Sequence, residues 1–203
     1  KGGCMKKLYA GEMFSGYGGL ALAIKAAFRE CGYDVETKWL AEFDDGPSKV
    51  LDERFIGIPN LGDVTAVDWH RSDLEVQLIG GGSPCQDISI AGGRKGMSEG
   101  TRSNLWVAQR EAVRIIRPEW VVWENVRGSC SAKAHSEMEY CSGCLGDGER
   151  GKELRELGRV LGDLSELGYD AKWKSYYASD VGAPHRRDRD FLVARSVQDS
   201  NSG

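Results

Sequence analysis

Several features that would mark a secreted, membrane-bound or nucleic-acid-coating protein are missing from this 203-residue chain. No apolar run approaches the roughly 20 residues that a membrane-spanning helix needs, and no signal-peptide pattern is present. The 31 acidic residues outnumber the 27 basic ones, and the net charge of −4 argues against a histone-like, generally basic protein. The six cysteines do not resemble the disulfide framework of a small secreted domain. We therefore expect a cytoplasmic protein.

The composition does offer enough apolar material for one folded domain. Hydrophobic residues make up 40% of the chain and charged residues 29%, which is ordinary for a soluble globular protein. A chain of this length supports a single core. We predict one domain over residues 5–198, with tails at 1–4 and 199–203.

The most informative stretch is residues 80–89, Gly-Gly-Gly-Ser-Pro-Cys-Gln-Asp-Ile-Ser. It follows residues 76–79, a short apolar run that predicts a buried strand. The glycines let another molecule approach the backbone, and Pro84 stiffens the turn that presents Cys85. A thiol at the carboxyl end of a strand, facing a helix N-terminus, has a lowered pKa and can act as a nucleophile. A buried structural cysteine in a glycine loop is the plainer alternative.

A second glycine-rich turn lies at residues 15–19. An apolar segment at 8–14 predicts a strand before it, and apolar residues at helical spacing over 20–28 predict a helix after it. Strand, glycine loop and helix typically hold a nucleotide-like cofactor, because backbone N–H groups and the helix dipole face the ligand. The spacing is not Gly-x-Gly-x-x-Gly and no Walker lysine follows. This favours an adenosine-bearing cofactor other than a dinucleotide or ATP.

Acidic residues stand at the ends of two further predicted strands. Residues 38–41 lead into Glu42, which is placed to accept both ribose hydroxyls of a nucleoside. A third short strand, predicted at 60–64, carries Asp63, which could accept from an adenine amino group. A solvated loop acid is the alternative for Glu42, and an Asx turn is the alternative for Asp63.

The apolar run at 120–123 has no alternation, as expected of a central parallel strand that is covered on both faces. It leads into Glu124. A carboxylate at the end of a buried strand is costly unless it serves catalysis or binding.

The remaining segments complete the predicted order of elements. They are a helix that begins after Ser103 or Asn104 and ends before Pro118, an amphipathic helix over 154–167, a strand over 173–178 and a closing strand over 191–194. Strands and helices thus alternate. We predict an open α/β fold with a mostly parallel, Rossmann-like sheet, helices on both faces and the site at the carboxyl ends of the strands.

Residues 128–151 differ from the rest, being rich in Gly, Ser, Cys and charge and without periodicity. Cys141 and Cys144, spaced as Cys-x-x-Cys, form half of a zinc site, and Cys130 with His135 could complete a tetrahedral set. A metal-free insertion is the alternative.

Taken in order, four motifs resemble those of the cytosine-C5 DNA methyltransferases. Residues 14–19 resemble their cofactor loop, 82–86 their nucleophile loop, 124–126 their Glu-Asn-Val signature and 187–189 the close of their Gln-x-Arg-x-Arg segment, with His185 at the position of the glutamine. The resemblance runs from about Leu8 to Ala194. It implies an S-adenosylmethionine-dependent methyltransferase of that fold type, with DNA as the partner and a flipped-out cytosine as the substrate.

The resemblance also implies roles for individual residues. The Cys85 thiolate would attack C6 of cytosine while Glu124 protonates N3, so that C5 can take the methyl group. Arg187 and Arg189 would hold the base, the phosphate or the catalytic loop, with Arg187 nearest the chemistry. The implied cofactor-binding residues are Phe14, Ser15, Gly16, Gly18, Gly19, Glu42, Phe43, Asp63, Val64, Pro84 and Leu105. The implied substrate-binding residues are Ser83, Gln86, Ser89, Asn125 and Val126.

Departures from the family pattern leave alternatives open. The target recognition domain and the last helix of the cofactor pocket are expected to be absent. This leaves three explanations: a fragment, a second chain that supplies them, or an insertion at 128–151 that has taken over part of their work. A catalytically incomplete subunit or scaffold is a second hypothesis, and the same chemistry on tRNA or with a modified alkyl donor is a third. A redox thiol at Cys85 with a Cys141–Cys144 dithiol ranks last. A phage or restriction–modification origin fits the compact chain.

Overall fold

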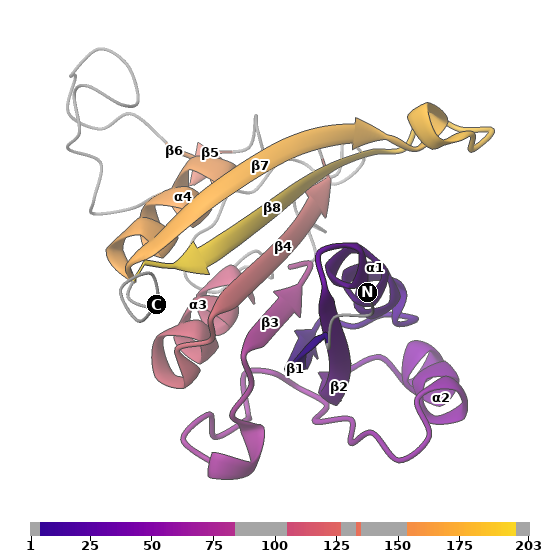
Figure 1. Ribbon diagram of the computed structural model, residues 1–203, viewed down its shortest axis with the longest axis vertical. Helices are drawn as coiled ribbons and strands as arrows, with labels where there is room; N and C mark the ends of the chain where they lie inside the picture. The colour runs from indigo at the N-terminus through magenta and orange to yellow at the C-terminus, as the bar shows by residue number, and fades with distance from the viewer. Residues whose placement is uncertain (1–4, 84–104, 127–132, 135–153, 198–203) are drawn as a thin grey trace.

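The structure is a computed structural model that describes residues 5–83, 105–126, 133–134 and 154–197 (Figure 1). Its elements are β1 (Lys6–Met13), α1 (Gly19–Glu30), β2 (Tyr33–Ala41), α2 (Asp45–Arg54), η1 (Ser72–Leu74), β3 (Leu78–Gly81), α3 (Leu105–Ile116), β4 (Trp120–Val126), β5 (Lys133–Ala134), β6 (Leu154–Arg155), α4 (Glu156–Glu166), β7 (Tyr169–Tyr177), η4 (Ala178–Val181) and β8 (Asp188–Ser196). Within these described ranges, none of the helices has the length and apolar character needed to cross a bilayer.

Six strands form one open sheet in the order β2-β1-β3-β4-β8-β7, and β5 pairs with β6 separately. The pairs β1–β2, β1–β3 and β3–β4 are parallel, whereas β8 runs antiparallel to both β4 and β7. Figure 1 shows why β8 is reversed: β7 and β8 form a long hairpin with η4 at its tip, and a hairpin needs no crossover helix. The predicted open, mostly parallel α/β sheet is confirmed.

Side chains along each strand alternate between the two faces of the sheet, so the strands contribute to two cores. The core under α1 consists of Leu8, Ala10, Ile24, Phe28, Val35, Leu78 and Val122. On the other face α3 and α4 lie side by side (Figure 1), and their core includes Met13, Trp39, Ile79, Trp106, Ala112, Val113, Val121, Trp123, Val160, Leu164 and Leu192. Helices therefore cover both faces, as predicted.

Three elements differ from their sequence-based predictions. Residues 60–64 are not a strand, because only Asn60 makes an isolated bridge to Leu40, after which Gly62 turns the chain with φ of 69°. The helix expected over 154–167 begins at Glu156, since Leu154 belongs to β6. The strand expected at 76–79 is present but lies two residues later, so that it ends on Gly81.

Candidate catalytic and cofactor site

The carboxyl ends of the parallel strands meet at one edge of the sheet, and the described candidate residues gather there. The loop 14–19 follows β1, Glu42 and Phe43 follow β2, and Gly82 and Ser83 follow β3. Glu124 and Asn125 lie near the carboxyl end of β4, the strand next to β3. The sheet topology thus brings together residues that are more than a hundred positions apart.

A cavity of about 460 Å³ opens at this edge. It is lined by Phe14, Gly16, Ala41, Glu42, Phe43, Asp44, Gly62, Asp63, Val64, Thr65, Gly82 and Leu105. Seven of these residues belong to the expected cofactor-binding set: Phe14, Gly16, Glu42, Phe43, Asp63, Val64 and Leu105. Phe43 is 73% exposed, so its aromatic ring is available for contact with a flat ligand in the cavity.

Glu42 ties two loops of this cavity together. Gly16 N–H donates to Glu42 Oε2 at 2.7 Å, and Asp44 N–H donates to Glu42 Oε1 at 2.8 Å. The backbone of Glu42 is held in turn by Asn60, whose Oδ1 accepts from Glu42 N–H at 2.9 Å. The sequence predicted that Glu42 binds a ligand. It did not predict that Glu42 also holds two loops together, or that Asn60 holds the Glu42 backbone. A carboxylate offers about four lone-pair sites, so two hydroxyls can still be accommodated.

The loop after β1 has a strained backbone, and the Ser15 hydroxyl links it to β2. Phe14 has φ of 56°, a left-handed conformation that is uncommon for a bulky residue and that clusters at functional sites. Ser15 Oγ donates to Glu12 O at 3.0 Å and accepts from Ala41 N–H at 3.2 Å, which joins the ends of β1 and β2. A Cβ at Gly18 would lie 2.3 Å from the Phe55 ring, so only glycine fits there. Ser15 and Gly18 therefore shape the cavity without lining it.

Asp63 makes the turn contacts of a structural aspartate and also lines the cavity. Its Oδ1 accepts from Thr65 N–H at 2.9 Å and from Thr65 Oγ1 at 2.7 Å, which is the turn expected of a structural aspartate. The same side chain lines the cavity.

Glu124 forms a half-buried ion pair with Arg189. The distance from Arg189 Nε to Glu124 Oε1 is 2.6 Å, and the two side chains are 22% and 27% exposed. Burial raises the pKa of the Glu124 carboxyl above its usual value, although the positive charges of Arg189 and Arg187 pull that pKa down. Arg189, rather than Arg187, makes the contact, since Arg187 is exposed and acts on Glu124 from a distance.

Gly82 is the residue where the cavity and Glu124 meet. It lines the cavity, and a Cβ on it would lie 2.8 Å from Glu124 Oε2 and 3.2 Å from Glu124 O. The absence of a side chain at Gly82 therefore lets the carboxylate approach the cavity wall. A ligand in the cavity and a second ligand held by Glu124 would be neighbours.

Glu12 lies in β1 just before the loop 14–19, and sequence reasoning gave it no role. It is 3% exposed on the α1 face at the end of β1, and burial raises the pKa of its carboxyl to about 8. The backbone N–H of Ala21 opposes this rise in pKa and the charge of Glu42 adds to it. Among the described residues neither carboxyl oxygen has a partner with full hydrogen-bond geometry, so the Ala21 N–H acts on the carboxyl only as a nearby dipole. The sequence did contain a signal for this buried acid, because Glu12 stands among apolar residues in the second half of β1.

Several expected site residues fall outside the described residues: Pro84, Cys85, Gln86, Ser89, Cys130, His135, Cys141 and Cys144. Ser83 and Asn125 are both 3% exposed at the strand ends, and Val126 pairs with Arg189 through the backbone. In the part of the chain that the structure describes, no group of three or more His, Cys, Asp or Glu residues could hold a metal. Zinc in 128–151 therefore stays a prediction.

Comparison with known proteins agrees with this geometry. Residues 8–202 match the family described as C-5 cytosine-specific DNA methylase. The chain belongs to this family. The orphan methyltransferase M.SPRI of Bacillus phage SPR is 30% identical over 195 residues, which cover 93% of this chain and 38% of that protein. The type II methyltransferase M.HhaI of Haemophilus parahaemolyticus is 28% identical over 182 residues, which cover 90% of this chain and 47% of that protein.

Solved structures show the same fold. DNMT2 of Spodoptera frugiperda superposes with a TM-score of 0.65 at 19% identity, over 93% of this chain and 50% of that one. Dnmt2 of S. pombe gives a TM-score of 0.63 at 15% identity, over 94% of this chain and 50% of that one. This methylase-family chain thus spans about half, or less, of the proteins that it matches.

Proposed function

We propose that this chain transfers a methyl group from S-adenosylmethionine to C5 of cytosine in DNA, through a covalent bond between Cys85 and C6 of the base. The observation that carries the proposal is the junction at Gly82, where the cavity wall touches the Glu124 carboxylate. The segment that leads to Cys85 starts at the next residue. Donor pocket and acid therefore lie at one edge of the sheet, and the sequence puts the proposed nucleophile two residues after Ser83.

The residues of the cavity fit an adenosine-bearing cofactor. Glu42 and Asp63 supply acceptors for hydroxyl and amino groups, and Phe43, Val64 and Leu105 supply apolar walls for a flat ring. S-adenosylmethionine would supply a methyl group activated on a sulfonium. Its positive charge suits a cavity that contains carboxylates and no cationic side chain among its lining residues.

The protein's own residues would activate the cytosine. The Cys85 thiolate forms a bond to C6 while Glu124 gives a proton to N3, which makes C5 electron-rich enough to take the methyl group. Loss of the proton from C5 then expels the thiolate, and N3 returns its proton. Burial supports this role, because it raises the pKa of Glu124 and so favours the proton-bearing form.

Exposed arginines beside this acid suit a DNA substrate. Arg186 and Arg187 are exposed just before β8, and the positive charge of Arg187 lowers the pKa of Glu124. Planar guanidinium groups form bidentate hydrogen bonds with phosphate. These side chains can therefore contact the DNA backbone beside a cytosine that has been flipped out of the duplex.

Covalent trapping tests the function. DNA that carries 5-fluorocytosine should form a stable adduct with the protein in the presence of S-adenosylmethionine, since fluorine at C5 blocks the final elimination. We expect an intact-mass increase that is lost in Cys85→Ala and retained in Cys31→Ala, which removes an exposed free cysteine. Absence of the adduct in the wild-type protein, despite cofactor binding, would overturn catalysis by this chain alone. An adduct with RNA and not with DNA would overturn the substrate.

Cofactor binding provides a separate prediction. Glu42→Ala should weaken binding of S-adenosylhomocysteine, the demethylated product, by roughly 10- to 100-fold, because it removes charge-assisted hydrogen bonds. Isothermal titration calorimetry measures this, with Glu53→Ala, an exposed acid on α2, as the matched control. Equal affinities in the two variants would contradict the assigned pocket.

A further inference from the structure

A line of buried contacts connects α4 to the residue that precedes Pro84. Trp106 Nε1–H donates to Asp163 Oδ2 at 2.7 Å, and the Trp106 ring packs edge-on against Trp123, with centroids 6.4 Å apart and planes at 76°. Trp123 Nε1–H then donates to Ser83 Oγ at 3.2 Å. Both indole side chains are fully buried, and Ser83 is 3% exposed.

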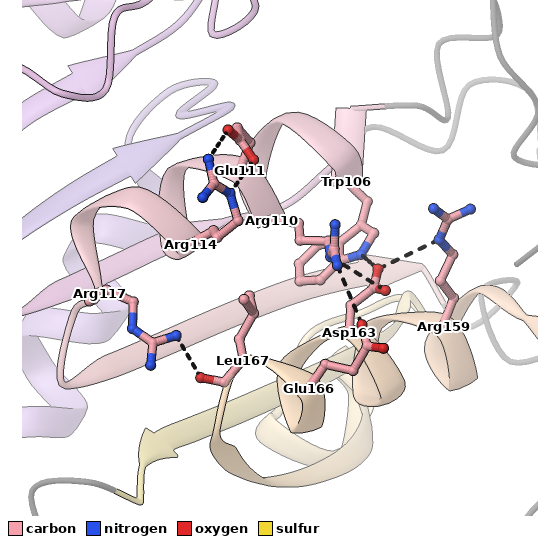
Figure 2. Close-up of polar contacts among 9 residues, drawn as sticks. All are labelled: Trp106, Arg110, Glu111, Arg114, Arg117, Arg159, Asp163, Glu166 and Leu167. Carbon is pink, nitrogen blue, oxygen red and sulfur yellow. Dashed lines mark hydrogen bonds and ion pairs between the residues drawn. The ribbon is translucent and has the colours of Figure 1, made fainter. Parts of the chain in front are cut away.

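The far end of this line is fixed by charge. Figure 2 shows the Asp163 carboxylate between Trp106 and the guanidinium groups of Arg110 and Arg159, each of which lies 3.5 Å away as an ion pair. Arg110 also pairs with Glu166 at 3.3 Å. A buried carboxylate with two such partners has little freedom to move, so the Trp106 indole is held in one orientation. Trp106 in turn limits where Trp123 can lie.

The other end of this line of contacts, at Ser83, lies just beyond the last backbone pair between β3 and β4. The last pair between β3 and β4 is Gly81 with Trp123. Beyond this pair the Trp123 indole reaches Ser83 on the α3 face, while the next residue of β4, Glu124, packs against Gly82 on the opposite face. Two neighbouring residues of β4 thus hold both sides of the turn that follows β3.

We propose that Trp123 is a positioning residue for the methyl transfer. Through its hydrogen bond to Ser83 it sets the point from which the chain departs toward Cys85, and it does so relative to Glu124 on the same strand. This inference rests on the proposed function. A displacement of about 1 Å at such a point costs up to roughly 100-fold in rate, whereas the cofactor cavity does not contain Trp123.

Three variants separate positioning from simple packing. Trp123→Phe keeps a buried ring and removes the donor, and Ser83→Ala removes the acceptor. Trp69→Phe removes an indole from the same core, where it packs against Trp39 with ring centroids 5.4 Å apart, and neither tryptophan lines the cavity. We expect the single-turnover methylation rate to fall roughly 10- to 100-fold in the first two variants. Cofactor affinity should stay within about twofold, and Trp69→Phe should keep the wild-type rate.

The double variant and the thiol give readouts that a packing role would not change. Because one hydrogen bond is lost in either single variant, Trp123→Phe with Ser83→Ala should be no slower than the slower single variant. The pH profile for alkylation of Cys85 by iodoacetamide, followed by peptide mass, should shift in Trp123→Phe and Ser83→Ala and not in Trp69→Phe. Additive rate losses, or an unchanged Cys85 profile, would overturn the inference.

The alkylation measurement does not depend on methyl transfer. If the wild-type protein fails to trap fluorinated DNA while the Cys85 profile still shifts in both variants, the proposed function fails and the positioning of the thiol stands. If the wild-type protein traps DNA and both variants trap it at the wild-type rate, only the positioning fails.

Discussion

Replacing Glu124 by glutamine is expected to lower the turnover number by roughly 10²- to 10⁴-fold, the usual contribution of a positioned acid or base. Glutamine preserves the shape that Gly82 accommodates, yet its amide is not an acid and cannot protonate N3 of cytosine as the proposed mechanism requires. Affinity for S-adenosylhomocysteine should be unchanged, because Glu124 touches the cavity only through Gly82. Steady-state kinetics with saturating cofactor, together with calorimetry, measure the two quantities on the same protein.

The chain offers a close control for this variant. Glu119 stands just before β4 and pairs with Arg195 of β8 at 3.2 Å, as Glu124 pairs with Arg189 of the same strand at 2.6 Å. Glu119→Gln therefore removes the ion pairs of Glu119 with Arg195 and with Lys6, at the end of β4 opposite to Glu124. It should leave turnover at the wild-type value. An equal loss in both variants would mean that Glu124 acts through strand pairing and would contradict its role as the acid.

The acid and its arginine partner illustrate what the sequence could and could not predict. Strand ends were predictable, because apolar runs broken by glycine or by an acid mark them locally. Which arginine reaches Glu124 was not predictable, since it depends on the register of β8 against β4. That register places Arg189 opposite Val126, two residues from Glu124 on the same face. Local patterns carry no information on such pairing between distant segments.

The three glycines at 80–82, two at the end of β3 and one just after it, show a second limit. The sequence suggested that they admit another molecule, and Gly82 does line the cavity. At the same time a Cβ at Gly81 would lie 2.8 Å from Gln109 Oε1, and one at Gly80 would lie 2.6 Å from Ile24 Cδ1. These two glycines make room for the protein's own side chains on opposite faces of the sheet. Space that helices occupy after folding cannot be distinguished from space for a ligand by sequence alone.

The resemblance supplied what local patterns could not. Phe43, Val64 and Leu105 carry no chemical signal of their own, and all three line the cavity as the family likeness implied. Trp123 and Ser83 were missed as a pair. Their contact joins positions 40 residues apart through side chains in the core, where sequence reasoning predicted only apolar packing.

The second large effect is expected at Glu12 and concerns stability. Burial raises the pKa of this carboxyl to about 8, against an ordinary value of 4.5 in the unfolded chain. Between these two pH values the folded protein keeps the proton and the unfolded chain has released it. The free energy of unfolding should therefore fall by about 1.4 kcal/mol for each pH unit in that window and level off above it. Glu12→Gln carries no ionisable proton and should lack this contribution.

The difference in unfolding free energy between Glu12→Gln and the wild-type protein should consequently grow in favour of the variant as pH rises, by several kcal/mol in total. Urea unfolding at pH values from about 5 to about 9 measures it. Glu30→Gln, at the exposed end of α1, is the control and should show a constant difference. A constant difference for Glu12→Gln as well would mean that the buried carboxyl ionises normally.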